Sequence, residues 1–193
     1  MIAAVVLAAG LSRRMGCDKL LLPLQGKPVF AYTVDRVAAY GFDQRILVTN
    51  TPEIAQYGMK MGFTVVPSPD TACGMGHSVA AGTRAIRQDM DGALYLNADQ
   101  PFLTADIIQT LCETFAHSGQ IVVPYREGRP SSPCLFPARF FEQLKDLIGE
   151  QGGRTIWKQC PEQVRRVDIE GIAALADLDR PEDYAAYVKK EDA

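Results

Sequence analysis

Short continuous runs of hydrophobic residues alternate along the chain with segments of helical periodicity. Residues 2–7 (IAAVVL) form the first run, and further runs occupy residues 45–49, 63–66, 93–96, 121–123 and 164–169. Continuous apolar runs of this length are typical of strands that are covered on both faces. We therefore predict a strand at each of these positions.

The intervening segments carry apolar side chains at helical spacing. Phe30, Val34 and Val37 share one face of a stretch that follows Pro28 and ends at Gly41. This arrangement predicts a helix with one buried side, because proline suits a helix start and glycine suits its end.

A second helix is predicted after Thr104, whose hydroxyl can cap it. Its apolar stripe consists of Ile107, Ile108, Leu111, Cys112 and Phe115. Less regular helices are predicted at residues 52–61, 77–88, 138–148 and 154–159, and a last one begins at Pro181.

Alternation of strands and helices favours an α/β fold. We predict a single domain over residues 1–193 with three layers (α/β/α), built on an open, mostly parallel sheet of Rossmann-like type. Ligands of such sheets bind beyond the carboxyl ends of the strands, near a switch in strand order. The segments after Leu7, Val66 and Leu96 are therefore the places to search for a site.

Composition narrows the function classes. The chain has 193 residues with a net charge of −3 and no run of basic residues, so nucleic acid is not an expected partner. Its five cysteines are widely spaced without a C-x-x-C pair, which indicates reduced thiols in a cytoplasmic protein and no structural zinc site. The apolar N-terminal run lacks a preceding basic region and is too short to span a bilayer, so no membrane association is expected.

The loop after the first predicted strand contains the clearest chemical signal. Ala8, Ala9 and Gly10 are small enough for a ligand to approach the backbone, and Arg14 and Lys19 bring positive charge. Such side chains suit the oxygens of a triphosphate. The loop is neither a P-loop nor a dinucleotide-binding glycine turn, since both of those glycine patterns are absent. The alternative is a solvated basic connection between a strand and a helix.

Two more loops can contribute. Gly76 and Ser78 lie where a helix is expected to begin, and helix N-terminal amides favour anions. Alternatively, Ser78 only caps that helix. Asp99 follows the strand at residues 93–96, where a carboxylate facing a polyphosphate would be a natural Mg²⁺ ligand. Its alternative role is ordinary turn chemistry.

These segments resemble a known family. The pattern L-A-A-G-x-S-x-R-M-G-x-x-K at residues 7–19, followed by L-L-x-L-x-G-K-P, is similar to the signature of MobA-like NTP transferases, and most similar to molybdenum cofactor cytidylyltransferases. The resemblance implies a fold of the nucleotide-diphospho-sugar transferase type. It also implies transfer of CMP from CTP to molybdopterin with release of pyrophosphate.

The resemblance assigns roles residue by residue. It implies catalytic roles for Lys19, Arg14 and Asp99, with Mg²⁺ as the cofactor bound by Asp99 and Asp179. Asp179 lies in D-L-D-R-P-E-D, which resembles the family's D-x-D-T-P-E-D, and Asp177 is the second candidate there. An acid before proline also suits a helix start. The implied nucleotide contacts are Leu7, Ala8, Ala9, Gly10, Ser12, Arg14, Lys19, Gly76 and Ser78.

The acceptor side departs from the family pattern. Residues 128–136 (GRPSSPCLF) match an acceptor-side loop, yet Ser132 stands where the family often has histidine, and Arg180 replaces the usual threonine. The acceptor therefore remains open between a phosphorylated pterin and a sugar- or polyol-phosphate.

Ala9 resembles the cytidylyl branch, which favours CTP over GTP. A molybdoenzyme or its maturation factor is the implied protein partner, and a non-catalytic cofactor carrier is the alternative from another class.

Overall fold

The structure is a computed structural model that describes residues 1–10, 18–68, 74–169 and 175. One large sheet runs through it in the strand order β10-β7-β9-β6-β1-β4-β5, and β8 pairs with β7 at the side. The strands are β1 (Ile2–Leu7), β4 (Gln44–Val48), β5 (Thr64–Val66), β6 (Gly92–Asn97), β7 (Ile121–Arg126), β8 (Arg129–Pro130), β9 (Cys134–Pro137) and β10 (Val164–Asp168). A separate hairpin joins β2 (Pro23–Leu24) to β3 (Lys27–Pro28).

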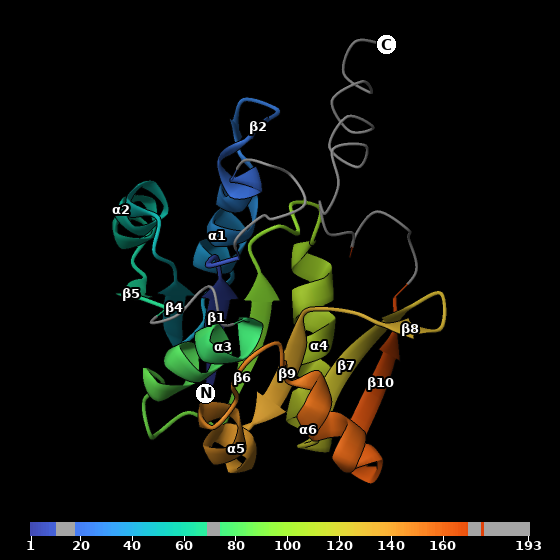
Figure 1. The fold of residues 1–193 in the computed structure, drawn as a ribbon. Helices are drawn as coiled ribbons and strands as arrows, with labels where there is room; N and C mark the ends of the chain where they lie inside the picture. The colour runs from blue at the N-terminus through green and yellow to red at the C-terminus, as the bar shows by residue number, and fades with distance from the viewer. Residues whose placement is uncertain (11–17, 69–73, 170–174, 176–193) are drawn as a thin grey trace.

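Helices cover both faces of the sheet (Figure 1). One apolar core joins the sheet to α1 (Val29–Tyr40), α2 (Pro52–Lys60) and α4 (Ala105–Ser118). The other joins it to α3 (Met75–Arg84), α5 (Phe141–Lys145) and α6 (Arg154–Gln159). The predicted three-layer α/β/α architecture is confirmed. Within the described ranges, no helix is long and apolar enough to cross a membrane.

Strand β1 explains why its sequence is apolar throughout. Ala4 and Val6 lie in the first core, Ala3 and Val5 lie in the second, and all four side chains are 0% exposed. Successive side chains of a strand point to opposite faces, so a strand between two helical layers needs apolar residues at every position.

Helix α4 forms as its pattern predicts. The Thr104 side chain accepts a hydrogen bond from the amide of Ile107 at 3.4 Å, and Gly119 ends the helix in the left-handed conformation. The predicted stripe is buried against the sheet. Capping and periodicity thus specify this helix locally.

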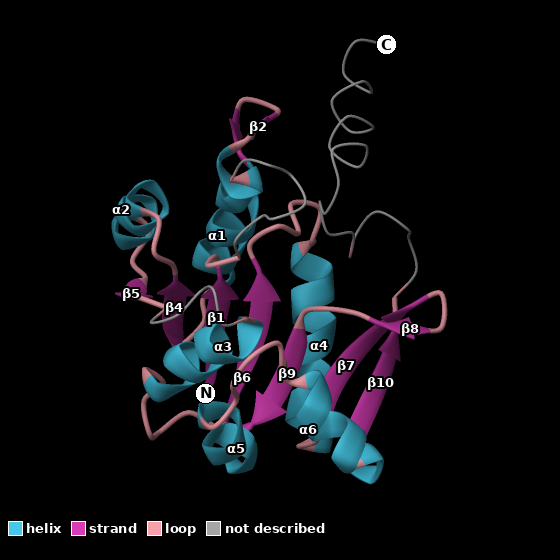
Figure 2. Cartoon of the chain, in the orientation of Figure 1, coloured by secondary structure: helices cyan, strands magenta, loops and turns pink. Residues whose placement is uncertain are grey.

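Strand order switches direction at β1 (Figure 2), which lies between β4 and β6 and is parallel to both. From β1 the chain proceeds outward through β4 and β5, then returns to β6 on the other side of β1. Leu7 lies opposite Asn97, and the amide of Ala98 donates to the carbonyl of Leu7 at 3.0 Å. The segments leaving β1 and β6 therefore start side by side, at the crevice where sheets of this kind bind ligands.

The structure corrects two predicted helices and adds a strand that was not predicted. The helix predicted at residues 138–148 is a 3₁₀ turn (Ala138–Phe140) followed by the short α5, and the chain then turns at Gly149 with φ 59°. Helix α3 begins at Met75 and ends at Arg84, earlier than the predicted range of 77–88. Strand β9 was not predicted, and it is antiparallel to both β6 and β7.

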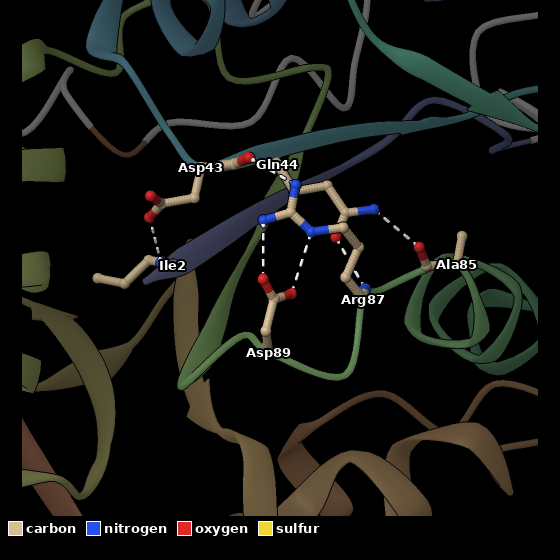
Figure 3. Close-up of polar contacts among 6 residues, drawn as sticks. All are labelled: Ile2, Asp43, Gln44, Ala85, Arg87 and Asp89. Carbon is tan, nitrogen blue, oxygen red and sulfur yellow. Dashed lines mark hydrogen bonds and ion pairs between the residues drawn. The ribbon is translucent and has the colours of Figure 1, made fainter.

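A polar network closes the amino end of the sheet, opposite the proposed site (Figure 3). The side-chain amide of Gln44 donates to the carbonyl of Ala85 at 2.8 Å, and its oxygen accepts from the amide of Arg87 at 2.9 Å. The amide of Ile2 donates to Asp43 at 2.7 Å. These bonds hold the segment after α3 against β1 and β4.

Candidate active site

Lys19 is held at the start of a short 3₁₀ turn (Lys19–Leu21). The side chain of Asp18 caps this turn by accepting from the amide of Leu20 at 3.1 Å, and Leu20 is 4% exposed in the core beneath it. The cap and the buried anchor fix the backbone from which the lysine side chain extends.

Lys19 and Asp99 meet at the carboxyl edge of the sheet. The lysine Nζ lies 2.6 Å from Oδ2 of Asp99, and the two side chains are 13% and 15% exposed. Asp99 stands in the turn that follows β6, whereas Lys19 arrives from the connection after β1. The segments that follow the neighbouring parallel strands β1 and β6 therefore bring Lys19 and Asp99 together, as expected.

The second oxygen of Asp99 is free for another ligand. Oδ1 is buried and has no hydrogen-bond partner. A buried carboxylate oxygen without a partner is costly, and a bound cation removes that cost. The described residues contain no group of three or more His, Cys, Asp or Glu side chains able to hold a metal ion. Mg²⁺ is usually bound by one or two carboxylates together with substrate phosphates and water, and Asp99 offers one ligand of that kind.

The structure describes only the first part of the predicted nucleotide loop, after β1. Leu7 is half-buried and Ala8 is 2% exposed, while the amide of Ala8 donates to the carbonyl of Val48 at 2.8 Å. Ala9 is half-buried and Gly10 is exposed, and a Cβ at Gly10 would meet no described atom within 4 Å. The predicted residues Ser12, Arg14, Asp177 and Asp179 lie outside the described residues.

Gly74 and Gly76, at the start of α3, pack closely against the loop after α5. The amide of Gly76 donates to the carbonyl of Gly149 at 2.8 Å. A Cβ at Gly76 would lie 2.7 Å from the carbonyl oxygen of Ile148, and one at Gly74 (φ 101°) would lie 2.5 Å from the backbone of Gly149. The close approach predicted here for a ligand is thus made by the protein's own backbone. The nucleotide contact of Gly76 stays a prediction.

This packing makes Gly76→Ala destabilising. The new methyl group would overlap two carbonyl oxygens, at 2.7 Å from Ile148 and 2.8 Å from Gln151, so the loops must separate. We expect a loss of about 1–3 kcal/mol and a Tm lowered by roughly 3–10 °C, measured by thermal unfolding. Gly10→Ala, in open space, is the matched control. An unchanged Tm in Gly76→Ala would show that the loops are not packed in this way.

Ser78 does not cap α3, so the capping alternative is wrong. The cap residue is Gly74, with no side-chain cap bond, and Ser78 is only 6% exposed inside the first turns of the helix. Its hydroxyl lies 2.9 Å from that of Ser68, which Asn50 holds through two hydrogen bonds of 2.8 and 2.9 Å. The Ser78 hydroxyl therefore already has a partner within the protein. A direct contact between Ser78 and the nucleotide stays a prediction.

A cavity of about 440 Å³ opens beside the ends of β1 and β6, on the side of α3 and α6. Leu7 and Asn97 border it where those two strands end. Its other lining residues combine apolar and aromatic walls with three arginines: Met75, Val79, Tyr95, Arg126, Glu127, Arg129, Pro130, Ser131, Ser132, Cys134, Phe136, Leu144, Gly152, Gly153, Arg154, Trp157 and Leu175. Its volume lies in the range of small-molecule sites.

Sequence reasoning did not identify most of these lining residues. It matched residues 128–136 to an acceptor-side loop, but Tyr95, Arg126 and Trp157 carry no local signal. They meet only because β9 inserts between β6 and β7 and brings α6 over this edge.

Two potential nucleophiles of the described cavity wall, Cys134 and Tyr95, are not ionised. Burial raises the pKa of the Cys134 thiol to about 12, and the thiol donates to the carbonyl of Ser131 at 3.3 Å. Burial also raises the pKa of Tyr95, whose hydroxyl lies 2.8 Å from that of Thr83. Both groups are therefore neutral near pH 7, so they shape the cavity and cannot attack as anions.

Comparisons with known proteins show the family of the chain. The family model of the MobA-like NTP transferase domain matches residues 4–165. Purine catabolism protein PucB of Bacillus subtilis is 31% identical, over 93% of this chain and 92% of its own. The molybdenum cofactor cytidylyltransferase of Escherichia coli is 26% identical, over 95% of this chain and 93% of its own.

Solved structures share the fold over the whole length. The crystal structure of Rv0371c from Mycobacterium tuberculosis has a TM-score of 0.83 at 25% identity and covers 97% of each chain. A manganese complex of the same protein has a TM-score of 0.79 at 24% identity, over 97% of this chain and 98% of that one. With the domain match spanning most of its length, the chain belongs to the family of MobA-like NTP transferases and is a nucleotidyltransferase of that family.

Proposed function

We propose that the protein transfers CMP from CTP to a molybdopterin-type acceptor, with Mg²⁺ as cofactor and pyrophosphate as the second product. The observation that carries this proposal is the meeting of Lys19 with Asp99, whose second oxygen is buried and unpaired, beside a cavity at the same edge of the sheet.

The nucleotide half of the site works by exchange of ion-pair partners. Before substrate binds, Lys19 and Asp99 neutralise each other at 2.6 Å. A triphosphate with its metal offers both groups a new partner, since the lysine can bind phosphate oxygens and the carboxylate can bind the cation. Arg14 adds a further cation, and the backbone of Leu7, Ala8, Ala9 and Gly10 borders the nucleotide, together with Ser12, Gly76 and Ser78. Asp179 is the proposed second metal ligand.

The acceptor half is the cavity. The half-buried Trp157 offers aromatic surface to a planar heterocycle such as a pterin, and the rings of Tyr95 and Phe136, 6% and 1% exposed, lie buried within the same wall. Arg129 and Arg154 are exposed at the cavity, where guanidinium groups suit a phosphate. A sugar- or polyol-phosphate would gain less from these walls, which supports the pterin acceptor.

The transfer needs alignment more than a general base. A phosphate monoester has a second pKa near 6, so the acceptor phosphate is largely dianionic at neutral pH. One of its oxygens attacks the α-phosphorus in line, a new P–O bond forms, and the bond to the β-phosphate breaks with its electron pair leaving on pyrophosphate. Mg²⁺ bound at Asp99 would supply charge neutralisation at the reacting phosphates. Lys19 holds the triphosphate and stabilises the charge that develops on the leaving group.

Two alternatives remain for testing. A non-catalytic cofactor carrier would have no use for a lysine–carboxylate pair with an unpaired buried oxygen. A sugar- or polyol-phosphate transferase would keep the same chemistry with another acceptor.

Cys112, Cys134 and Cys160 are free thiols, which supports a reducing, cytoplasmic setting where a molybdoenzyme or its maturation factor receives the product.

A pyrophosphate-release assay with each NTP, with and without molybdopterin, tests the function. We expect release with CTP and molybdopterin together, and a cytosine dinucleotide form of the cofactor in the mass spectrum. Equal turnover with GTP would contradict the assignment of cytosine as the base of the nucleotide. Release with a sugar- or polyol-phosphate in place of molybdopterin would move the acceptor to that class, and molybdopterin binding without release would favour the carrier.

Arg154→Gln tests the acceptor cavity. The Arg154 guanidinium lies 5.8 Å from the ring centre of Trp157 and is exposed at the cavity. Its loss should raise KM for the acceptor about tenfold and leave KM for CTP unchanged, because one charge-assisted contact contributes roughly 1.5 kcal/mol or more.

Arg139→Gln is the matched control for this measurement. Arg139 also lies over an aromatic ring, at 5.1 Å from Phe140, but it faces Gly119 and Gln163 near the amino end of the strands. Steady-state kinetics should show no change in this variant. If both variants behave alike, the acceptor does not bind in the cavity.

A further inference from the structure

Gln100 lies between the two halves of the proposed site. It directly follows Asp99 and is 1% exposed. Its side-chain nitrogen Nε2 donates to the carbonyl of Ser132 at 3.2 Å, and Ser132 lines the cavity. One buried amide therefore connects the turn that carries the metal carboxylate to a wall of the acceptor cavity.

The backbone of Gln100 is anchored from the opposite face. The Thr33 hydroxyl of α1 donates to the carbonyl of Gln100 at 3.3 Å, and Thr33 is itself 1% exposed. The amide of Leu103 donates to the same carbonyl at 3.2 Å. The side chain thus extends from a fixed point toward Ser132.

The bond to Ser132 comes where sheet pairing has ended. Strands β6 and β9 pair in register from Gly92 with Pro137 to Tyr95 with Cys134. The pairing ends there. No further β-sheet hydrogen bonds join the chain that leads to Asp99 with the segment from Ser131 to Pro133. Gln100 supplies a link across this interval, which the sheet itself does not provide.

The chemistry of the side chain supports a specific role. Oε1 of Gln100 is buried without a hydrogen-bond partner. A methionine of similar length would fill this space without an unpaired oxygen of its own, although it would give up the bond to Ser132. An amide here therefore carries an energetic disadvantage that its bond to Ser132 must offset.

We propose that Gln100 is a positioning residue that fixes the acceptor cavity relative to Asp99, so that the acceptor phosphate lies in line with the α-phosphorus. This inference rests on the proposed function for its effect on catalysis. Gln100 is too buried to touch substrate, so it acts through Ser132 and the turn of Asp99. A small misplacement of aligned reactants can cost up to about a hundredfold in rate.

Gln100→Met tests this role kinetically. We expect kcat to fall about tenfold or more, while KM for CTP and the affinity for Mn²⁺ stay within about twofold of wild type. A purely structural residue would lower the amount of folded protein and leave kcat per folded molecule unchanged.

Gln44→Met is the matched control. The side-chain amide of the half-buried Gln44 also links two segments through its hydrogen bonds to Ala85 and Arg87, but at the amino end of the sheet (Figure 3). We expect a lower Tm with an unchanged kcat. If Gln100→Met behaves in the same way, or loses CTP binding in proportion to kcat, the proposal is overturned.

Amide hydrogen exchange provides a readout that needs no acceptor. In Gln100→Met, exchange in residues 129–135 should become at least several-fold faster than in wild type, with residues 44–48 unchanged. Unchanged exchange in residues 129–135 would refute the link between the two halves. If wild-type protein releases no pyrophosphate with any acceptor, the proposed function fails, and the exchange result alone still decides whether Gln100 holds the cavity wall.

Discussion

Asp99→Asn should lower the rate of pyrophosphate release by about a hundredfold or more, since a positioned charge at a reacting phosphate contributes roughly 3 kcal/mol. Asparagine keeps the shape of the side chain but removes the charge that faces Lys19 at 2.6 Å, and it offers a metal ion a weaker ligand. The affinity for Mn²⁺ in the presence of CTP should fall together with the rate. Initial rates and a Mn²⁺ titration of the same protein preparation measure both effects.

Asp35→Asn is the control for this change. Asp35 is paired with Lys27 at 2.6 Å and accepts from the Tyr57 hydroxyl at 2.7 Å, so both of its oxygens are occupied within the protein. Its pair is also more exposed, at 37% and 30% of the side chains. We expect turnover close to wild type there. Turnover near wild type in Asp99→Asn itself would show that Asp99 is not the metal ligand.

Lys19→Met should also lower turnover by about a hundredfold, but with the opposite effect on the metal. In the protein without nucleotide, the lysine cation lies beside the carboxylate and competes with any cation that approaches Asp99. Its removal should therefore raise the affinity for Mn²⁺ without nucleotide about tenfold. It should also weaken the coupling between metal and CTP binding, because such coupling is reciprocal.

Isothermal titration calorimetry with Mn²⁺, with and without CTP, measures this coupling. Lys27→Met removes the lysine of the comparable pair with Asp35 and should leave Mn²⁺ binding unchanged. Weaker or equal Mn²⁺ binding by nucleotide-free Lys19→Met would contradict the exchange of partners. Such a result would leave the metal site at Asp99 to be judged by Asp99→Asn.

The parts of the fold that sequence predicted are those with local causes. Strand β1 carries apolar residues on both faces, because helices cover both faces of the sheet there. Helix α4 carries its cap at Thr104 and its buried stripe within one segment. The meeting of Lys19 and Asp99 followed from topology, because the carboxyl ends of β1 and β6 lie side by side.

The parts that sequence missed depend on contacts between distant segments. Strand β9 is short and ends in Pro137, so its pairing with β6 and β7 has no periodic signal. Gly74 and Gly76 at the start of α3 indicated close approach correctly, but the partner is the backbone of residues 148–151. Ser78 was interpreted as a cap or a nucleotide contact, and its bond to Ser68 depends on how β5 and α3 pack. The local sequence indicates that a residue makes a close contact, but the contacting residue is determined by the packing of segments that are distant in the sequence.

The most direct test is a crystal structure of the protein with Mn²⁺ and a non-hydrolysable CTP analogue, in which anomalous scattering locates the metal. We predict a manganese peak about 2.0–2.3 Å from Oδ1 of Asp99 and from phosphate oxygens, with Nζ of Lys19 moved from the carboxylate onto the triphosphate. A triphosphate bound away from this edge of the sheet, or a metal that does not touch Asp99 while Lys19 keeps its ion pair, would contradict the account.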